Sequence, residues 1–186
     1  MKRLFVSVTA LVVGLTSTHS VFSVEDLPRA YGPFSLGMTV GAFSKLTGAP
    51  VFGAKTGDTV SSLKAENLEK FVPAKNRARE HNAGFVFAGK NPDSKLYQIG
   101  YTPDETSVDV IKSQYARFGA PRTVRLPDTD RSALEWCQKG KTRILVAYKN
   151  GSIRAASVTI EELAIMGQAL ADEGQSTERA TCGQWP

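Results

Sequence analysis

The sequence predicts an α+β fold in which two helix-plus-antiparallel-hairpin units form a two-layer helix-on-sheet structure. An amphipathic helix pattern occurs twice, and each copy ends in the triplet Gly-Ala-Pro, at residues 48–50 and 119–121. Alternating apolar segments separated by turn residues follow each helix, as is typical of antiparallel hairpins. We therefore expect one compact domain, with a first unit over residues 24–101 and a second unit over residues 102–186.

The N-terminus has the pattern of a secretory signal peptide. Lys2-Arg3 precede an apolar run at residues 4–15, which is too short to span a bilayer core of about 30 Å as a helix. Small residues up to Ser23 fit a cleavage site, so cleavage is expected after Ser23, with a cut nearer Ala30 as the alternative. The protein is therefore expected to be periplasmic or secreted, with no transmembrane span after cleavage.

Composition narrows the classes of partner. Loss of the signal peptide, residues 1–23, removes Lys2 and Arg3 and lowers the formal net charge from +5 to +3. Nucleic-acid-binding proteins are expected to carry a denser basic stripe with interleaved aromatic residues, so no nucleic-acid partner is predicted. Glycine-rich phosphate-binding motifs are absent from the sequence, and no cofactor is predicted.

The first unit begins with a short strand that leads into a helix. Thr39 is a good N-cap, apolar residues follow it at three-residue spacing, and residues 48–50 end the helix. The rest of this region is expected to form a loop over 51–60, either a short helix over 61–72 or a strand over Val60–Ala65, and an exposed polar connection over 73–83.

A hairpin is expected to complete the first unit. Residues 84–89 and 95–101 are rich in aromatic and β-branched residues, and the second segment alternates between its two faces. The segment between them, Lys-Asn-Pro-Asp-Ser at residues 90–94, has the residue types that favour a turn.

The second unit opens with the clearest helix start in the chain. Thr102-Pro103-Asp104-Glu105 is a capping box with proline at the first helical position. Apolar residues from Val108 to Phe118 recur on one helical face, and Gly119 is expected as a left-handed C-cap.

The remainder of the second unit is expected to contain a charged loop at residues 122–132, three strands, and a C-terminal helix. Asn150-Gly151 between two apolar segments is a strong signal for a two-residue hairpin turn. The expected strands lie at 133–137, 142–148 and 153–160, and the helix at 161–172 is followed by a polar tail.

The chain contains two cysteines, Cys137 and Cys182. Outside the cytoplasm an even pair of cysteines usually forms a disulfide, which here would tether the C-terminal tail to the second unit. A zinc or redox site is the alternative, but the pair has neither a nearby histidine nor a C-x-x-C spacing, and no metal site is predicted.

The segment Leu36-Gly37-Met38-Thr39, which enters a helix ending at residues 48–50, resembles a motif of small exported bacterial proteins. Together with the order of the elements, it is similar to the SmpA/OmlA (BamE-like) proteins and to the secreted β-lactamase-inhibitory proteins. The resemblance implies a two-layer α+β structure that binds other proteins through a sheet or loop surface. The lipidated cysteine usual in BamE-like proteins is missing, and Tyr101-Thr102-Pro103 replaces Gly-Met-Thr in the second copy.

Two groups of residues are candidates for binding. Lys75, Arg77 and Arg79 form a basic segment that, with Lys139, Lys141 and Arg143, would suit an anionic partner. The alternative for these side chains is an ordinary solvated surface.

Four aromatic residues in the expected strands are the second group: Tyr97, Tyr101, Trp136 and Tyr148. Aromatic side chains exposed on a sheet would form a binding face. The alternative is that these four rings fill the core.

These observations favour an exported, non-enzymatic envelope protein that acts as a protein-binding module, with another envelope or extracellular protein as its partner. One alternative is a binder of anionic cell-envelope polymer or lipid through the basic segment. A second alternative is a secreted hydrolase that uses His81, although this histidine lies in a polar segment typical of a solvated side chain.

Overall fold

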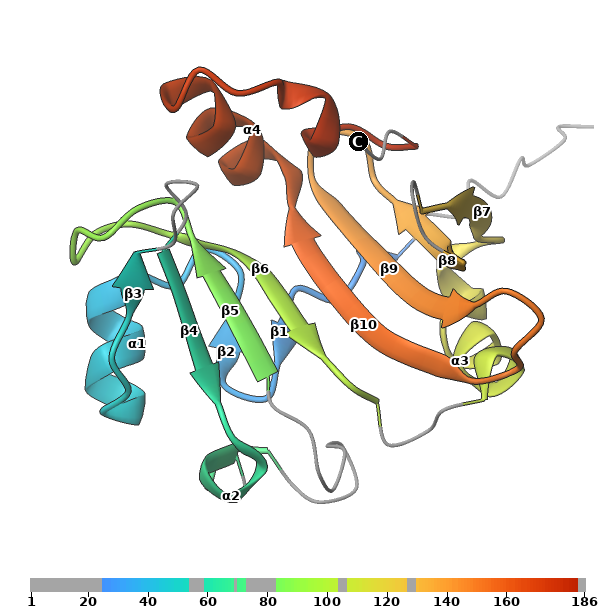
Figure 1. Ribbon diagram of the computed structural model, residues 1–186, viewed down its shortest axis with the longest axis horizontal. Helices are drawn as coiled ribbons and strands as arrows, with labels where there is room; N and C mark the ends of the chain where they lie inside the picture. The colour runs from blue at the N-terminus through green and yellow to red at the C-terminus, as the bar shows by residue number, and fades with distance from the viewer. Residues whose placement is uncertain are drawn as a thin grey trace, which may run out of the picture.

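The structure, a computed structural model, describes residues 25–53, 59–68, 70–72, 83–103, 107–126 and 130–183. Its largest element is one antiparallel sheet of eight strands in the order β3-β4-β5-β6-β10-β9-β8-β7 (Figure 1). The strands of this sheet are β3 (Phe52–Gly53), β4 (Thr59–Leu63), β5 (Ala83–Phe87), β6 (Leu96–Tyr101), β7 (Arg122–Arg125), β8 (Arg131–Cys137), β9 (Thr142–Lys149) and β10 (Ala155–Glu162).

The other elements are short. Two small strands, β1 (Ala30–Tyr31) and β2 (Phe34–Ser35), pair with each other. Among the described residues, no helix is long and apolar enough to span a membrane. The helices are α1 (Val40–Thr47), α2 (Ala65–Leu68), α3 (Val108–Gln114) and α4 (Leu163–Asp172), with 3-10 turns η2 (Ala116–Phe118) and η3 (Thr177–Ala180).

The predicted fold class of two helix-plus-antiparallel-hairpin units is wrong. Each of the helices α1 and α3 is followed by four strands rather than a hairpin, and all eight strands join one continuous sheet. The half of the chain that ends with β6 and the half that begins with α3 are joined where β6 pairs with β10. In this pairing Ile99 lies opposite Ile160. The protein is therefore organised by one large sheet, with short helices around it.

The prediction missed strands because they are short and lie at the edges of the sheet. Arg122–Arg125 was expected in a charged loop, but it forms β7, whose Arg122 lies opposite Glu135. Phe52–Gly53 was also expected in a loop, and it forms the opposite edge strand. Charged and short edge strands resist further pairing, and the same features remove the apolar alternation by which strands are recognised.

The helix starts give one confirmed and one corrected prediction. The Thr39 side chain accepts a hydrogen bond from the backbone N–H of Ala42, as expected of an N-cap. The second helix begins later than its predicted capping box, because Ser107 is the N-cap and accepts from the N–H of Val110. Residues 104–106, which include part of that box, lie outside the described residues.

The two halves repeat one set of contacts. The N–H of Val40 donates to the carbonyl of Ser94 at 2.9 Å, and the N–H of Val108 donates to the carbonyl of Ile153 at 2.8 Å. Each N-cap, moreover, bridges to the residue just before the last strand of its own half: Thr39 to Lys95 and Ser107 to Arg154. The start of each helix is thus fixed to the final strand of its half.

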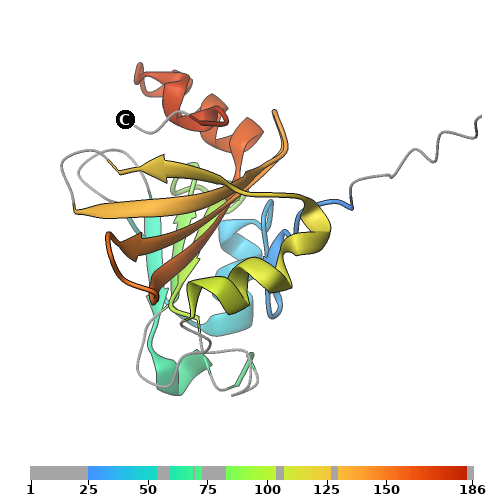
Figure 2. The same cartoon turned by 90° about the vertical axis from the view of Figure 1, so that its right-hand side faces the viewer.

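The main core lies on one face of the sheet, which we call the inner face. The helices α1 and α3 and the strands β1 and β2 lie on this side (Figure 2). The rings of Phe34, Phe43 and Phe85 have centroids 4.7–5.7 Å apart in this core. At the other end, the indole N–H of Trp136 donates to the carbonyl of Gly119 at 3.0 Å.

Tyr101 yields a prediction about alkaline pH. Its ring stacks on Tyr31 at 4.0 Å, and burial, reinforced by Tyr115, raises the pKa of its phenol above the usual value near 10. The folded chain therefore keeps this proton above pH 10, whereas the unfolded chain loses it, so the free energy of unfolding should fall as pH rises above about 10. Tyr101→Phe should make that fall shallower and remove one late-titrating phenol from the absorbance titration. An equal alkaline loss in both proteins would contradict the assignment.

Candidate functional site

The second face of the sheet, which we call the outer face, is covered at one end by α4 and the C-terminal tail, residues 177–183 (Figures 1 and 2). Over the rest of this face, no described helix packs on the strands. The side chains there alternate with the core residues of the inner face and are mostly small. The outer-face residues are Phe52, Val60, Ser62, Gly84, Val86, Gln98, Gly100, Arg122, Val124, Arg131, Ala133, Glu135, Cys137, Arg143, Leu145, Ala147, Lys149, Ser157, Thr159 and Glu161.

An apolar groove of about 280 Å³ lies on the outer face over β3, β4 and β5. Phe52, Val60, Gly84 and Val86 are among the residues that line it. Phe52 is 62% exposed, which is high for a large apolar side chain on a sheet. We call this the outer groove.

The outer groove opens onto a row of small residues that crosses four strands. Ser62 lies opposite Gly84, Gly84 lies opposite Gly100, and Gly100 lies opposite Thr159. With neighbouring strands about 4.8 Å apart, the row is about 14 Å long. The outer-face residues beside it, Val86 and Gln98, are also uncharged. The middle of the outer face therefore carries mostly short side chains and no charged ones.

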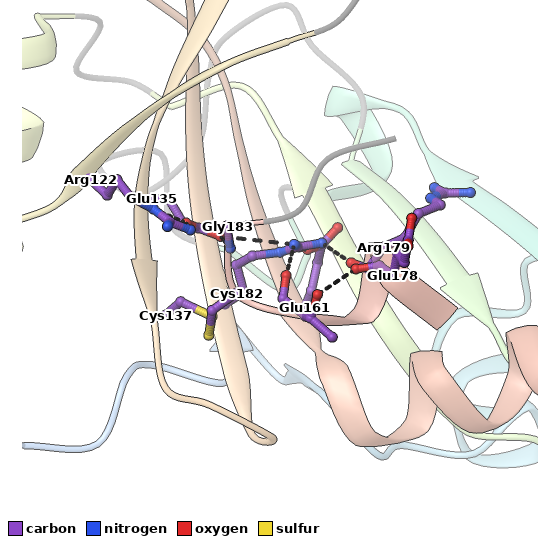
Figure 3. Close-up of a disulfide and its surroundings, with 10 residues drawn as sticks. Arg122, Glu135, Cys137, Glu161, Glu178, Arg179, Cys182 and Gly183 are labelled. Carbon is purple, nitrogen blue, oxygen red and sulfur yellow. Dashed lines mark hydrogen bonds and ion pairs between the residues drawn. A yellow bond between two sulfur atoms is a disulfide. The ribbon is translucent and has the colours of Figure 1, made fainter. Parts of the chain in front are cut away.

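The covered end of the outer face is held by a buried arginine. The Arg143 side chain is 1% exposed, and its Nε donates to the Glu161 carboxylate at 2.6 Å. Its two terminal nitrogens donate to the carbonyls of Thr181 and Arg179, at 3.0 and 2.7 Å (Figure 3 shows the surroundings). One guanidinium thus joins β10 to the C-terminal tail.

Glu135 extends this network to the edge of the sheet. One carboxylate oxygen accepts from the backbone N–H of Gly183 at 3.0 Å, and the other accepts from Arg122 at 2.7 Å. Burial raises the pKa of the neighbouring Glu161 carboxyl, and the Arg143 guanidinium opposes that shift. The charged groups of this network therefore pair with one another, and the network anchors the C-terminal tail to the sheet.

The predicted disulfide is confirmed. Cys137 on β8 and Cys182 in the tail are bonded, and they lie beside the arginine network (Figure 3). A covalent bond and three hydrogen bonds therefore hold the same short tail against the sheet.

Only part of the predicted basic group lies in the described residues. Lys75, Arg77 and Arg79 lie outside the described residues, as does His81. Lys139 and Lys141 are exposed, but Arg143 is buried in the network. The inclusion of Arg143 in an exposed basic group was wrong, because its strand position faces the tail rather than solvent.

The expected exposed aromatic face is also wrong. Trp136 and Tyr97 are 2% and 3% exposed, in the main core and beneath α4 respectively. Tyr101 and Tyr148 are half-buried and pack against the main core. The four rings therefore pack in two separate clusters and do not form one exposed face.

The residues that sequence reasoning missed are the glycines of the row and the partners of Arg143. A glycine inside each of two adjacent strand patterns, Gly84 and Gly100, was a readable signal of close approach to a backbone. The pairing of Arg143 with Glu161 depends on the β9–β10 register, which no local pattern specifies.

A second hollow, of about 390 Å³, lies between α4 and the β5–β6 hairpin. Ala88, Ile165 and Ala169 line it, and Asp93 and Asp172 are on its rim. Asp172 accepts a hydrogen bond from Gln168 within α4. We attribute this hollow to the small side chains with which α4 packs on the sheet.

Comparison of the chain with protein-family models, with curated proteins and with solved structures finds no match.

Arg143→Met should strongly destabilise the protein. Removing the guanidinium leaves the carboxylates of Glu161 and Glu135 buried with one partner fewer, and breaking a buried ion pair in this way costs about 3–5 kcal/mol of unfolding free energy. Urea unfolding monitored by tryptophan fluorescence measures the loss. Arg125→Met, on the exposed edge strand, is the control and should change stability by less than about 0.5 kcal/mol. Similar losses in both variants would contradict the anchor role.

The disulfide should hold the tail. Its closure spans 45 residues, so Cys137→Ser with Cys182→Ser should lower the unfolding free energy by about 2–4 kcal/mol. Limited trypsin digestion should then cut after Arg179 sooner than in the oxidised wild type, which mass spectrometry of the released C-terminal peptide detects. A tail that stays equally resistant would show that the arginine network alone suffices.

Proposed function

We propose that this chain is an exported, non-enzymatic protein-binding module of the bacterial envelope and that it binds its partner through the outer face. The resemblance to SmpA/OmlA proteins and β-lactamase-inhibitory proteins implies binding through a sheet or loop surface. The disulfide and the finding on membrane spans are compatible with an exported protein.

The observation that carries this proposal is the outer groove with its exposed Phe52. Large apolar side chains are costly to leave in water, and a grouped apolar surface on a soluble protein is typical of a binding site. Phe52, Val60 and Val86 form such a group beside an uncharged row of small residues. Aromatic residues at the centre of an interface contribute a large share of binding energy.

The sheet also supports binding by its rigidity. The strands β4 and β5, which carry most of the lining of the outer groove, are each paired on both sides, so this lining is held by backbone hydrogen bonds. A surface that is ordered before binding loses little conformational entropy when its partner arrives. The partner in this proposal is another envelope or extracellular protein.

The proposal predicts that Phe52→Ser weakens capture. A chain of residues 24–186, which include every described residue, is oxidised, immobilised and crosslinked to proteins of an envelope extract from the source organism. The captured protein is then purified, and its affinity for the wild type and for each variant is measured by titration. Removing an aromatic residue from the centre of an interface costs about 2 kcal/mol of binding free energy, which corresponds to a roughly thirtyfold weaker affinity.

The matched control is Ile153→Ser, which removes a 75%-exposed apolar side chain at the β9–β10 hairpin. It should leave the affinity unchanged. Equal weakening by both variants would reject the outer groove as the binding surface. Capture that disappears in high salt would instead favour the alternative, an anionic polymer or lipid bound through Lys75, Arg77 and Arg79.

A further inference from the structure

The hollow of about 390 Å³ between α4 and the β5–β6 hairpin is separate from the outer groove, because the two have no lining residue in common. Its apolar lining consists of Ala88, Ala164, Ile165 and Ala169, and most of these side chains belong to the small core beneath α4. Typical small-molecule sites have volumes of roughly 300–1,000 Å³. The hollow is therefore large enough for a small organic molecule with an apolar body.

The rim of the hollow carries more negative than positive charge. Asp93, on the hairpin, and Asp172, in the last turn of α4, are both exposed. In the described part of the chain, no ion pair joins either carboxylate to a cation. Lys95 is the cation among the described lining residues, so two carboxylates and one ammonium group give a formal charge of −1.

The end of α4 adds to the negative potential. The carbonyl groups at the C-terminus of a helix carry a partial negative charge, which a cation in the last turn would stabilise. However, α4 has no basic residue in its last turn, and it ends with Asp172 followed by Glu173 as the C-cap. The last turn therefore offers negative charge that no residue of the turn itself balances.

The two rim carboxylates belong to elements that are held in place. Next to Asp93, the carbonyl of Pro92 accepts a hydrogen bond from the backbone N–H of Gly41 at 2.8 Å, which fixes the hairpin to the start of α1. Asp172 accepts a hydrogen bond from the amide of Gln168, one turn earlier in α4, at 2.6 Å. A ligand would thus meet a rim that is ordered before binding, which lowers the entropic cost of binding.

We propose that this hollow binds a small organic amine, with its apolar body against the alanines and its ammonium group toward Asp93 and Asp172. An ammonium group donates hydrogen bonds and accepts none, so it complements carboxylates. Burial of the apolar body in the hollow removes it from water, which is favourable. A ligand with a carboxylate would instead be repelled by the rim. The inference goes beyond the proposed function, since it concerns another site and another class of ligand.

The test is a titration of ¹⁵N-labelled, oxidised residues 24–186 with 2-phenylethylamine at low ionic strength, followed by amide chemical shifts. We expect saturable shifts, with a dissociation constant in about the millimolar range, at the amides of Ala88, Ile165 and Ala169. The control probe is 3-phenylpropionate, which carries the same ring with a carboxylate and should give no saturable shifts there. An equal response to both probes, shifts centred elsewhere, or no shifts would each overturn the inference.

A lysine side chain of a partner protein has the same ammonium group and is distinguished by a third probe. Nα-acetyl-lysinamide carries the ammonium group on a thin chain without a bulky apolar body, so it should bind more weakly than 2-phenylethylamine. If it binds as tightly, the hollow accepts a lysine side chain of another protein, and the small-amine proposal is wrong.

Two variants should change the amine affinity in opposite directions. Asp172→Asn keeps the size of the side chain and the oxygen that accepts from Gln168, but it removes a negative charge and should weaken binding about two- to fivefold. Lys95→Gln removes the like charge from the rim and should strengthen binding by a similar factor. General damage to the fold would not produce this pair of opposite changes.

Asp109→Asn, at an exposed position in the first turn of α3, is the matched control and should leave the amine affinity unchanged. Folded Asp172→Asn and Lys95→Gln proteins that bind 2-phenylethylamine as the wild type does would reject the inference. A loss of affinity in Asp109→Asn equal to that in Asp172→Asn would also reject it, because the effect would then belong to the net charge of the protein.

This inference and the proposed function fail in different ways. If Phe52→Ser abolishes capture but 2-phenylethylamine does not bind the hollow, the outer face binds protein and the amine site is wrong. If the amine binds the hollow but Phe52→Ser leaves capture intact, the amine site is correct and the proposed function is wrong.

Discussion

The guanidinium of Arg143 is the group on which the arrangement of the C-terminal half depends. A buried cation without partners would cost more free energy than a domain of this size has available, so its nitrogens must find acceptors. Glu161 supplies one from the neighbouring strand, and the backbone of the tail supplies two more. The tail is therefore required by the charge in the sheet, and the disulfide beside it adds a covalent constraint to the same position.

The tail in turn determines which part of the outer face stays open. Together with α4 it covers the end of the sheet that carries Arg143, Glu135 and Glu161. The buried charges thus lie beneath protein, whereas the described residues of the middle and of the β3–β5 side are small or apolar. The exposed charges of the outer face, on Arg122, Arg131 and Lys149, lie on its β7–β9 side. The uncharged part of this face is therefore its β3–β6 side.

Local signals predicted the elements that local interactions hold. The Thr39 cap and the two hairpin strands that became β5 and β6 depend on residues close in sequence, and each lies where its pattern placed it. Asn150-Gly151 does form a turn, in which the N–H of Ser152 donates to the carbonyl of Lys149, but β9 and β10 pair only from Tyr148 and Ala155, so the connection is longer than the two-residue turn predicted. The edge strand β7 and the pairing of Arg143 depend on strands distant in sequence. A charged segment such as Arg122–Arg125 becomes a strand only because β8 offers it a partner, and this information is absent from the segment itself.

The same distinction explains why the candidate site was not visible in the sequence. Aromatic residues in strands suggested an exposed face, yet the inner core of a large sheet needs many bulky side chains, and Trp136 and Tyr97 are used for packing. The informative residues were those whose short or missing side chains leave the outer face open. The sequence shows a glycine within each of two strand patterns, but only the β5–β6 register places Gly84 opposite Gly100. The row of small residues on the outer face is defined by short or missing side chains from four strands, so it follows from three-dimensional arrangement rather than from a motif.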